Sequence, residues 1–476
     1  MDWDIVIGIE THVQLKTKTK QFSGASTSFG NEPNSQGCLV SLAYPGVLPV
    51  LNQEAVNCAI KFGLSIDAII NRKSIFARKN YFYPDLPKGY QISQFELPIV
   101  GEGKLSILID NHTKDVRILR AHLEEDAGKS SHGLSHGKSG IDLNRAGTPL
   151  LEIVTEPDMS SAEEAVAYAK KLHDLVQWIG ICDGNMQEGN FRCDVNVSVK
   201  KKGSDVLGTR REIKNLNSFK SVQKAINYEY KKQIKLIESG QKIEQSTLSW
   251  DEKNNKTKII RQKEDAHDYR YFPEPDLPKL SLSNKDLNDI KENLPELPNE
   301  KLDRFLKVYD IKEQDLNIIT SDLELADYFE SLVKLTKLHQ ATANWILVEL
   351  LRYTKEKNIT VKEFNVNQSR VSELIILYND GKLTNTNAKK IFNLMINTNK
   401  TASELMIEEG LMIIDDDDFI KNAVKNVFDK NPNEFDRLKN GESKLVGFFM
   451  GQVMKEVKGK ANPKSIQELI NKYIGD

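Results

Sequence analysis

The stretch GIETHVQL, residues 8–15, alternates between two kinds of side chain. After the glycine, its odd-numbered positions are apolar or β-branched, whereas its even-numbered positions carry a carboxylate, an imidazole and an amide. These polar residues are Glu10, His12 and Gln14. Successive side chains of a β-strand point to opposite faces, so the three polar side chains share one face. The pattern therefore predicts a strand that presents a carboxylate beside an imidazole.

Several other segments before residue 290 also predict strands with acidic side chains. They are HLEEDAGKS (122–130), PLLEIVTEP (149–157), FRCDVNVSVK (191–200) and RREIKNL (210–216). If these segments belong to one sheet, their acids and one imidazole can form a single concave surface. Its members would be Glu10, His12, Glu124, Glu125, Glu152, Asp194 and Glu212.

Two interpretations of these polar faces stay open at this point. A polar strand face commonly meets solvent, and this is the simpler interpretation for any single strand. A cluster of carboxylates, however, repels itself unless a cation compensates the charge. Carboxylates with an imidazole suit a hard divalent ion such as Mg²⁺, which often bridges protein to nucleotide phosphates. The second interpretation is therefore a magnesium site.

The sequence lacks a complete glycine-rich motif for nucleotide phosphates. The tripeptide GKS at 128–130 resembles the end of a P-loop, but Leu123 stands where that motif requires glycine. A nucleotide would therefore be held by metal ions and basic side chains. The candidates are Arg78, Lys79, Lys88, Arg120, Lys129, Arg145 and Lys214.

The chain of 476 residues is long enough for two or three domains. Short β-branched runs dominate up to about residue 290, with helices expected from Ser160 to Gly180 and over 218–239. The proline-containing segment KENLPELPNEKL (291–302) predicts a linker, and helical patterns follow it. Within these patterns, TNTNAKKI (384–391) is expected to interrupt the helices. We predict an α+β fold with an N-terminal domain (1–293), an all-α domain (294–400) and a small α-helical tail (401–476).

Composition favours a cytoplasmic protein without membrane contact. Lys and Arg number 66 against 68 Asp and Glu, so no global basic field announces a nucleic-acid partner, although a local patch would suffice. The four cysteines form no CxxC pair and are expected to be reduced thiols. The beginning MDWD is acidic, unlike a signal peptide, and WILVELL (345–351) is too short to cross a bilayer.

Segments along the whole chain resemble the GatB family, the B subunits of bacterial glutamyl/aspartyl-tRNA amidotransferases. The matching segments are IGIETHVQL (7–15), LAYPGVLPVLN (42–52), RKNYFYPDLPKGYQISQF (78–95), HLEEDAGKS (122–130), DLNRAGTPLLEIVTEPD (142–158), RCDVNVSV (192–199), EIKNLNSF (212–219), DYRYFPEPDLP (268–278) and GFFMGQVMKEVKGKANP (447–463).

This resemblance implies a fold and an activity. The N-terminal domain would be a cradle with an antiparallel sheet, similar to the glutamine synthetase fold, and the tail would resemble YqeY. The family is an ATP-dependent carbon–nitrogen ligase that phosphorylates the side-chain carboxylate of Glu on tRNA(Gln) or Asp on tRNA(Asn), using Mg²⁺. Ammonia, released from glutamine by the partner GatA, then displaces phosphate. GatC would complete the heterotrimer.

The resemblance also implies roles for individual residues. Glu10, His12 and Glu125 would surround the metal, and further ligands or supporting groups would be Glu124, Glu152, Asp194 and Glu212. Glu125 would also gate ammonia, whose path Lys79 and Lys88 would line. Basic residues of the tail suited to tRNA phosphates are Lys455, Lys458 and Lys460.

Zinc is not expected. Many family members carry two cysteines in a CPVC segment, whereas this chain has Cys38 but Ser41 in the second position. Cys38 is therefore expected to be a plain buried thiol.

Two other functions remain as alternatives. The first is an ATP-dependent carboxylate–amine ligase that acts on a small molecule, which would have no need of the helical and tail domains. The second is a tRNA-binding scaffold subunit without catalysis of its own.

Overall fold

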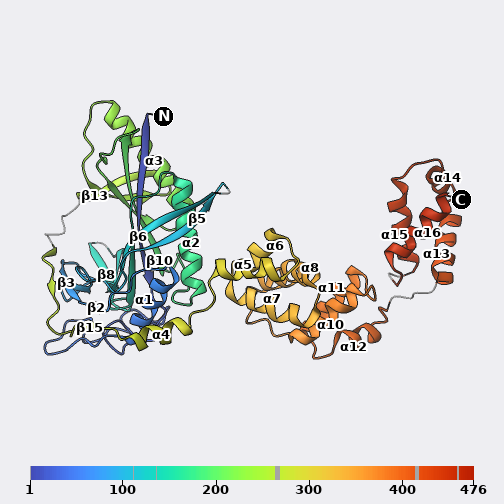
Figure 1. The fold of residues 1–476 in the computed structure, drawn as a ribbon, viewed down its shortest axis with the longest axis horizontal. Coiled ribbons are helices and arrows are strands. Elements are labelled where there is room, and N and C mark those ends of the chain that lie inside the picture. Colours follow the sequence, from blue (N-terminus) through green and yellow to red (C-terminus); the bar gives the residue numbers. More distant parts are fainter. Residues whose placement is uncertain are drawn as a thin grey trace. The chain divides into compact units, whose positions relative to one another are not determined.

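The computed structural model describes residues 2–110, 112–135, 137–262, 269–412, 417–457 and 460–475 (Figure 1). The chain divides into two compact units, Met1–Leu297 and Pro298–Asp476. The first unit combines a large sheet with helices, and the second is helical. This arrangement confirms the predicted α+β class, while the predicted division at residue 401 stays a prediction.

An eleven-stranded sheet dominates the described part of the first unit, and β1 (Trp3–Gln14) lies near its centre. The strand order is β13-β12-β11-β10-β1-β9-β6-β4-β3-β14, and β5 pairs with β6. All neighbours are antiparallel except β11 and β12. The other strands are β3 (Ala77–Asn80), β4 (Tyr90–Ser93), β5 (Gly103–Ile109), β6 (His112–Glu125), β9 (Pro149–Thr155), β10 (Phe191–Lys201), β11 (Arg211–Leu216), β12 (Ser246–Asp251), β13 (Lys256–Gln262) and β14 (Phe272–Pro273).

Two short pairs of strands lie outside this sheet. They are β2 (Lys73–Ser74) with β15 (Leu280–Ser281), and β7 (Lys129–Ser135) with β8 (Lys138–Asp142).

Helices α2 (Ala162–Trp178) and α3 (Phe219–Glu238) fall within the two ranges that the sequence predicts. Hydroxyl groups begin both helices, because Ser161 accepts a hydrogen bond from the Glu164 amide and Ser218 accepts one from the Ser221 amide. The two helices pack against each other, α2 also contacts β5, and α3 also contacts β10 and β11. The remaining helices of this unit are α1 (Gln53–Ser65) and α4 (Asn284–Glu292).

The odd-numbered residues of β1 from Ile7 onward are buried in the core. Ile7 and Val13 are completely buried, and Ile9 is nearly so. Side chains of α2 and α3, such as Leu172 and Ile226, are also fully buried. Because side chains alternate along a strand, the even-numbered residues of β1 lie on the other face, where the cavities described below are found.

The second unit consists of helices. They are α5 (Pro298–Val308), α6 (Glu313–Ile319), α7 (Leu323–Thr336), α8 (His339–Trp345), a π-helical turn (Ile346–Leu350), α9 (Leu351–Lys357), α10 (Gln368–Asn379), α11 (Asn385–Ile396), α12 (Ala402–Glu408), α13 (Asp417–Lys430), α14 (Pro432–Lys439), α15 (Leu445–Glu456) and α16 (Pro463–Gly475). A separate hydrophobic cluster joins α13 to α16 through residues such as Val424, Phe449 and Ile466.

One sequence-based prediction in this unit is wrong. The segment 384–391 does not interrupt a helix, because it begins α11. The Thr384 hydroxyl accepts a hydrogen bond from the Asn387 amide, which starts the helix, and Ala388, Ile391 and Phe392 are buried on one side of it. Burial of this apolar stripe outweighs the weak helix propensity of asparagine and threonine.

No helix among the described residues is long and apolar enough to cross a membrane.

Candidate active site

The strand register places four site residues in one row across the sheet. His12 on β1 lies opposite Arg192 on β10 and Glu152 on β9. Glu152 in turn lies opposite His122 on β6. Directly opposed residues of adjacent strands project to the same face, so this row concentrates two imidazoles, one guanidinium and one carboxylate.

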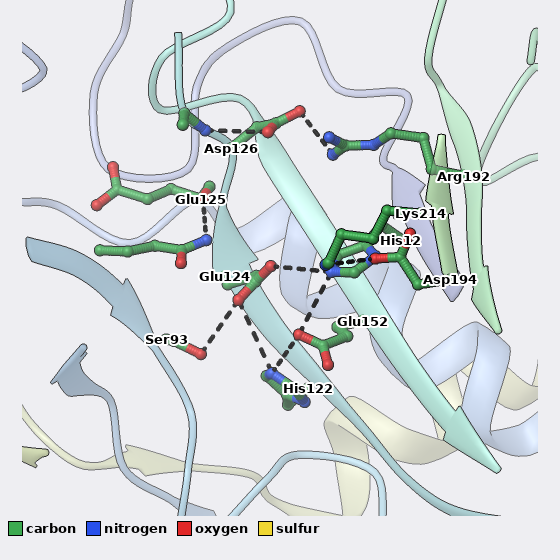
Figure 2. Close-up of polar contacts among 12 residues, drawn as sticks. His12, Ser93, His122, Glu124, Glu125, Asp126, Glu152, Arg192, Asp194 and Lys214 are labelled. Carbon is green, nitrogen blue, oxygen red and sulfur yellow. Dashed lines mark hydrogen bonds and ion pairs between the residues drawn. The ribbon is translucent and has the colours of Figure 1, made fainter. Parts of the chain in front are cut away.

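Glu124, two residues along β6 from His122, completes a compact cluster (Figure 2). His12 Nε2 is 3.5 Å from Glu152 Oε2 and 3.8 Å from Glu124 Oε1. His122 Nε2 is 3.3 Å from Glu152 Oε2 and 3.9 Å from Glu124 Oε2. Glu124 and His122 are buried, with exposed fractions of 2% and 4%. Two carboxylates and two imidazoles therefore share one small volume.

The charged groups of this cluster shift one another's pKa values. Burial alone would lower the pKa of His12, but Glu152, Asp194 and Glu124 raise it above its ordinary value. Burial would raise the pKa of Glu152, yet His122 and His12 hold it well below its usual range.

The geometry of His12, Glu124 and Glu152 fits a divalent cation. One ligand atom from each lies within 4.8 Å of the others. Two carboxylates and one imidazole are donors that Mg²⁺ or Mn²⁺ accepts, and a bound ion would compensate the negative charge. The buried Nδ1 of His122 has no hydrogen-bond partner among the described residues, while Nε2 of the same ring lies beside Glu152. His122 is thus placed to support the Glu152 carboxylate.

The structure does not bring Glu125 into this cluster. Consecutive strand residues face opposite sides, so Glu125 points away from His12 (Figure 2). Its carboxylate accepts hydrogen bonds from the Ile92 amide at 3.0 Å and from the Lys88 ammonium. The prediction that Glu125 surrounds the metal therefore has no support in this geometry.

Lys79 lies on the cluster side of the sheet, unlike Lys88. Its ammonium is 5.3 Å from the centre of the Tyr269 ring. Burial would lower the pKa of Lys79, but Glu124 and neighbouring groups raise it above the ordinary value. The two lysines that the sequence assigns to one path thus lie on different faces.

The other predicted acids form a second group around a lysine. Lys214 Nζ lies 2.8 Å from Asp194 Oδ2 and 3.4 Å from Glu212 Oε1. Glu10 Oε1 accepts a hydrogen bond from the side-chain amide of Asn196 at 2.9 Å. The Lys214 ammonium compensates the negative charge of acids that the sequence predicted to bind a metal. These acids therefore lie next to the cluster of His12, Glu124 and Glu152 and are not part of it.

Two cavities open onto this face of the sheet, with volumes of about 940 and 1100 Å³. Both are lined by His12, Arg145, Arg192 and Lys214. Lys129 lines the first cavity, and Lys79 and Glu124 line the second. Two ligands can therefore approach each other at the residues that the cavities share.

Some predicted cationic residues are engaged elsewhere. Arg78 forms an ion pair with Glu274 at 2.7 Å, and Arg120 donates a hydrogen bond to the Phe95 carbonyl at 3.3 Å. Arg78, Lys88 and Arg120 do not occur among the described residues that line the two cavities. These partners could not be predicted from the sequence alone, because each contact joins residues that lie far apart in the chain.

Sequence reasoning missed Arg192, Asp126 and His122 as site residues. Arg192 Nη2 donates a hydrogen bond to Asp126 Oδ2 at 2.9 Å, and His122 lies beside Glu152. All three belong to the segments whose alternation predicted the site. Arg192 is two residues from Asp194, a predicted site residue, and side chains two residues apart on a strand share a face. Strand alternation could therefore have identified Arg192.

Cys38 is half-buried, not the plain buried thiol that we expected. Its sulfur lies 3.2 Å from the Ser23 hydroxyl and 3.1 Å from the Ser41 hydroxyl. Burial would raise the pKa of the thiol, but these hydroxyls and Lys20 lower it.

The tail lysines are described only in part. Lys455 is exposed on α15, and Lys460 is partly exposed beyond its end. Lys458 lies outside the described residues.

Comparison with known proteins gives the same family throughout the chain. The GatB/GatE catalytic domain matches residues 5–288, and the GatB domain matches residues 327–474. Proteins from Thermodesulfovibrio yellowstonii and Thioalkalivibrio sulfidiphilus are each 51% identical, with 100% of both chains covered. A protein from Neisseria meningitidis is 50% identical over 99% of each chain. All three relatives are named as B subunits of aspartyl/glutamyl-tRNA(Asn/Gln) amidotransferases. The chain therefore belongs to the GatB family.

Proposed function

We propose that this chain uses ATP to activate the side-chain carboxylate of Glu on tRNA(Gln), Asp on tRNA(Asn), or both, for amide formation. The observation that supports this most strongly is the cluster of His12, Glu124 and Glu152 beside two cavities with shared walls. The relatives' names describe transamidation of these tRNAs.

The chemistry requires two substrates to meet. A carboxylate does not react with ammonia in water, because its oxygen is too poor a leaving group. Transfer of the γ-phosphoryl group from ATP to a carboxylate oxygen gives an acyl phosphate, and ammonia then displaces phosphate from the carbonyl carbon. Phosphoryl transfer depends mainly on alignment and on compensation of negative charge. Two cavities that share Arg145, Arg192 and Lys214 meet that requirement.

His12, Glu124 and Glu152 would hold Mg²⁺, which when bound neutralises charge on the phosphates. His122 keeps the Glu152 carboxylate in place. Lys129, Arg145 and Lys214 would contact phosphate oxygens from the cavity walls. Glu10, Asp194 and Glu212 then serve to hold Lys214 and its neighbours.

The remaining predicted residues belong to ammonia delivery and to tRNA binding. Glu125 and Lys88 form a buried ion pair behind the strand whose front carries Glu124, and both would lie along the path by which ammonia arrives. Lys79 faces the second cavity, where ammonia would arrive. GatA would supply the ammonia from glutamine, GatC would complete the complex, and Lys455 and Lys460 would contact tRNA phosphates.

The test uses the enzyme assembled with its partner subunits. Misacylated tRNA(Gln) and tRNA(Asn) are incubated with ATP, Mg²⁺ and glutamine, and the amino acid on each tRNA is identified. Glu124→Gln should lower amide formation at least about 10²-fold. Loss of this carboxylate would weaken Mg²⁺ binding, and the negative charge of the transferring phosphoryl group would then lose its main stabilisation. Its tRNA affinity should stay within about twofold of the unmodified chain, since a buried carboxylate makes no contact with the tRNA phosphates.

Each alternative predicts a different result. Undiminished amide formation by Glu124→Gln would indicate a scaffold without catalysis. Turnover of free glutamate with ammonia and ATP, in the absence of tRNA, would indicate a ligase for a small molecule.

A further inference from the structure

Three cationic side chains line both cavities, and their contacts differ. Lys214 is held between Asp194 at 2.8 Å and Glu212 at 3.4 Å. Arg145 donates hydrogen bonds to the carbonyl oxygens of Ala127 at 3.0 Å and Gly128 at 2.8 Å. Each of these cations therefore already contacts two oxygen atoms of the protein.

Arg192 makes fewer hydrogen bonds to the protein than Arg145 does. Its Nη2 donates to Asp126 Oδ2 at 2.9 Å. Its Nε is buried and has no hydrogen-bond partner among the described residues. The side chain is 34% exposed and lies on the same face of the sheet as His12, the residue opposite it on β1. The exposed part of the guanidinium lines both cavities, so an anion at their junction can accept hydrogen bonds from its remaining N–H groups.

Asp126 fixes the orientation of this guanidinium. It is 4% exposed, and its Oδ1 accepts a hydrogen bond from the Ala127 amide at 2.9 Å. Its own amide donates to the Thr148 carbonyl at 2.8 Å, and Arg145 Nε lies 3.5 Å from Oδ2. These contacts hold both the backbone and the carboxylate of Asp126, so Arg192 is oriented before any ligand arrives.

We propose that the Arg192 guanidinium binds the phosphoryl group during its transfer from ATP to the side-chain carboxylate, and that Asp126 is its positioning residue. This inference rests on the proposed function. A carboxylate oxygen forms a bond to the γ-phosphorus while the bond from that phosphorus to the bridging oxygen breaks. ADP leaves with the electron pair, and Arg192 keeps its protons throughout.

The planar guanidinium suits this step better than a lysine would. Its parallel N–H groups match two phosphoryl oxygens, whereas an ammonium is a point charge with no fixed orientation. The negative charge on the transferring group spreads over its equatorial oxygens in the transition state, where an oriented donor is most effective.

The experiment measures ADP formation that depends on misacylated tRNA, with the assembled complex and without an ammonia source. Arg192→Gln should lower the maximal rate about 10²–10³-fold. The Kd for ATP should change less than about threefold, because the contact strengthens in the transition state. Arg192→Lys should recover no more than about tenfold of the rate, since it restores charge without the planar donors.

Two further variants test the positioning role of Asp126. Asp126→Asn should lower the rate about tenfold with an unchanged Kd for ATP. The double variant with Arg192→Gln should be no slower than Arg192→Gln alone, because both changes remove the same interaction. A rate that falls by the product of the two single effects would overturn the positioning role.

The matched control is the pair of exposed Arg117 and half-buried Asp158, whose Nη2 and Oδ1 atoms are 2.6 Å apart. Neither residue lines the described cavities, so Arg117→Gln and Asp158→Asn should leave the rate unchanged. Arg192→Gln should also bind Mn²⁺ within about twofold of the unmodified chain, which verifies an intact fold and cluster.

The outcomes separate this inference from the proposed function. If the unmodified complex forms no ADP in response to misacylated tRNA, the proposed function fails. If the unmodified complex is active and both Arg192 variants match its rate, the proposed function stands and the role of Arg192 is wrong. An equal loss in rate and in ATP affinity would assign Arg192 to ground-state binding and also overturn the inference.

Discussion

Glu124 and Glu125 are consecutive residues of β6, yet their carboxylates serve opposite faces of the strand (Figure 2). Glu124 Oε1 lies 3.8 Å from His12 Nε2, whereas Glu125 accepts a hydrogen bond from the Ile92 amide at 3.0 Å. Both residues are 2% exposed, so burial does not distinguish them. Their partners do, because Glu124 meets imidazoles beside a cavity and Glu125 meets the Lys88 ammonium.

This difference predicts which of the two acids binds a divalent cation. Glu124→Gln removes one charged ligand and should weaken Mn²⁺ binding about 10–100-fold or more. Glu125→Gln changes a carboxylate on the far side of the strand and should leave the Kd within about twofold. Electron paramagnetic resonance of free Mn²⁺ during a titration gives both constants. Equal weakening by the two variants would contradict the division of roles.

His122 should influence the same constant without being a ligand of the ion. Its Nε2 lies 3.3 Å from Glu152 Oε2, so His122→Ala frees that carboxylate to turn and should weaken Mn²⁺ binding about 10–100-fold. His122→Gln keeps an N–H donor and should recover most of the affinity. His173→Ala is the matched control, because His173 contacts the Gly184 carbonyl at 2.8 Å and lines neither cavity.

Lys88 should stabilise the fold through its ion pair with Glu125. The two side chains are only 5% and 3% exposed, so Lys88→Met leaves a buried carboxylate without its cation. The free energy of unfolding should fall by about 3–5 kcal/mol in urea titrations. Lys88→Met combined with Glu125→Gln should recover much of this loss. The exposed pair of Lys104 and Asp115 provides the control, and Lys104→Met should have no measurable effect.

The pH dependence of stability should reveal Asp126. Burial alone would raise the pKa of this carboxyl group, but Arg192 and Arg145 hold it below its ordinary value. A depressed pKa in the folded state stabilises the protein at neutral pH, and this contribution is lost as the pH falls through the folded-state pKa. Asp126→Asn should therefore be about 1–3 kcal/mol less stable than the unmodified chain at pH 7.

The difference between the two proteins should shrink as the solution becomes acidic, because the unmodified carboxyl group then binds a proton. Urea titrations at a series of pH values measure it. A difference that grows toward acidic pH would show that the carboxyl pKa is raised rather than lowered.

The sequence predicted much of the fold because alternation and helix caps are local properties. Helices α2 and α3 lie within their predicted ranges, whereas α1 was not predicted. Strand β1 carries its polar residues on one face as expected. The prediction failed at 384–391, where tertiary burial of Ile391 and Phe392 decides the helix.

The candidate site was predicted less completely, because its membership depends on register between distant strands. Alternation alone cannot show that Glu152 lies between His12 and His122. It also cannot show that Lys214 reaches Asp194, since the contact joins side chains of different strands. In HLEEDAGKS, two adjacent acids looked equivalent until the structure placed their carboxylates on opposite faces.

The most direct test of the proposed metal site is anomalous diffraction from crystals of the complex soaked with Mn²⁺ and a non-hydrolysable ATP analogue. We expect an anomalous peak at bonding distance from His12 Nε2, Glu124 and Glu152, at the junction of the two cavities. A fully occupied peak bound by Glu125 instead, or none among these three side chains at saturating Mn²⁺, would contradict this assignment.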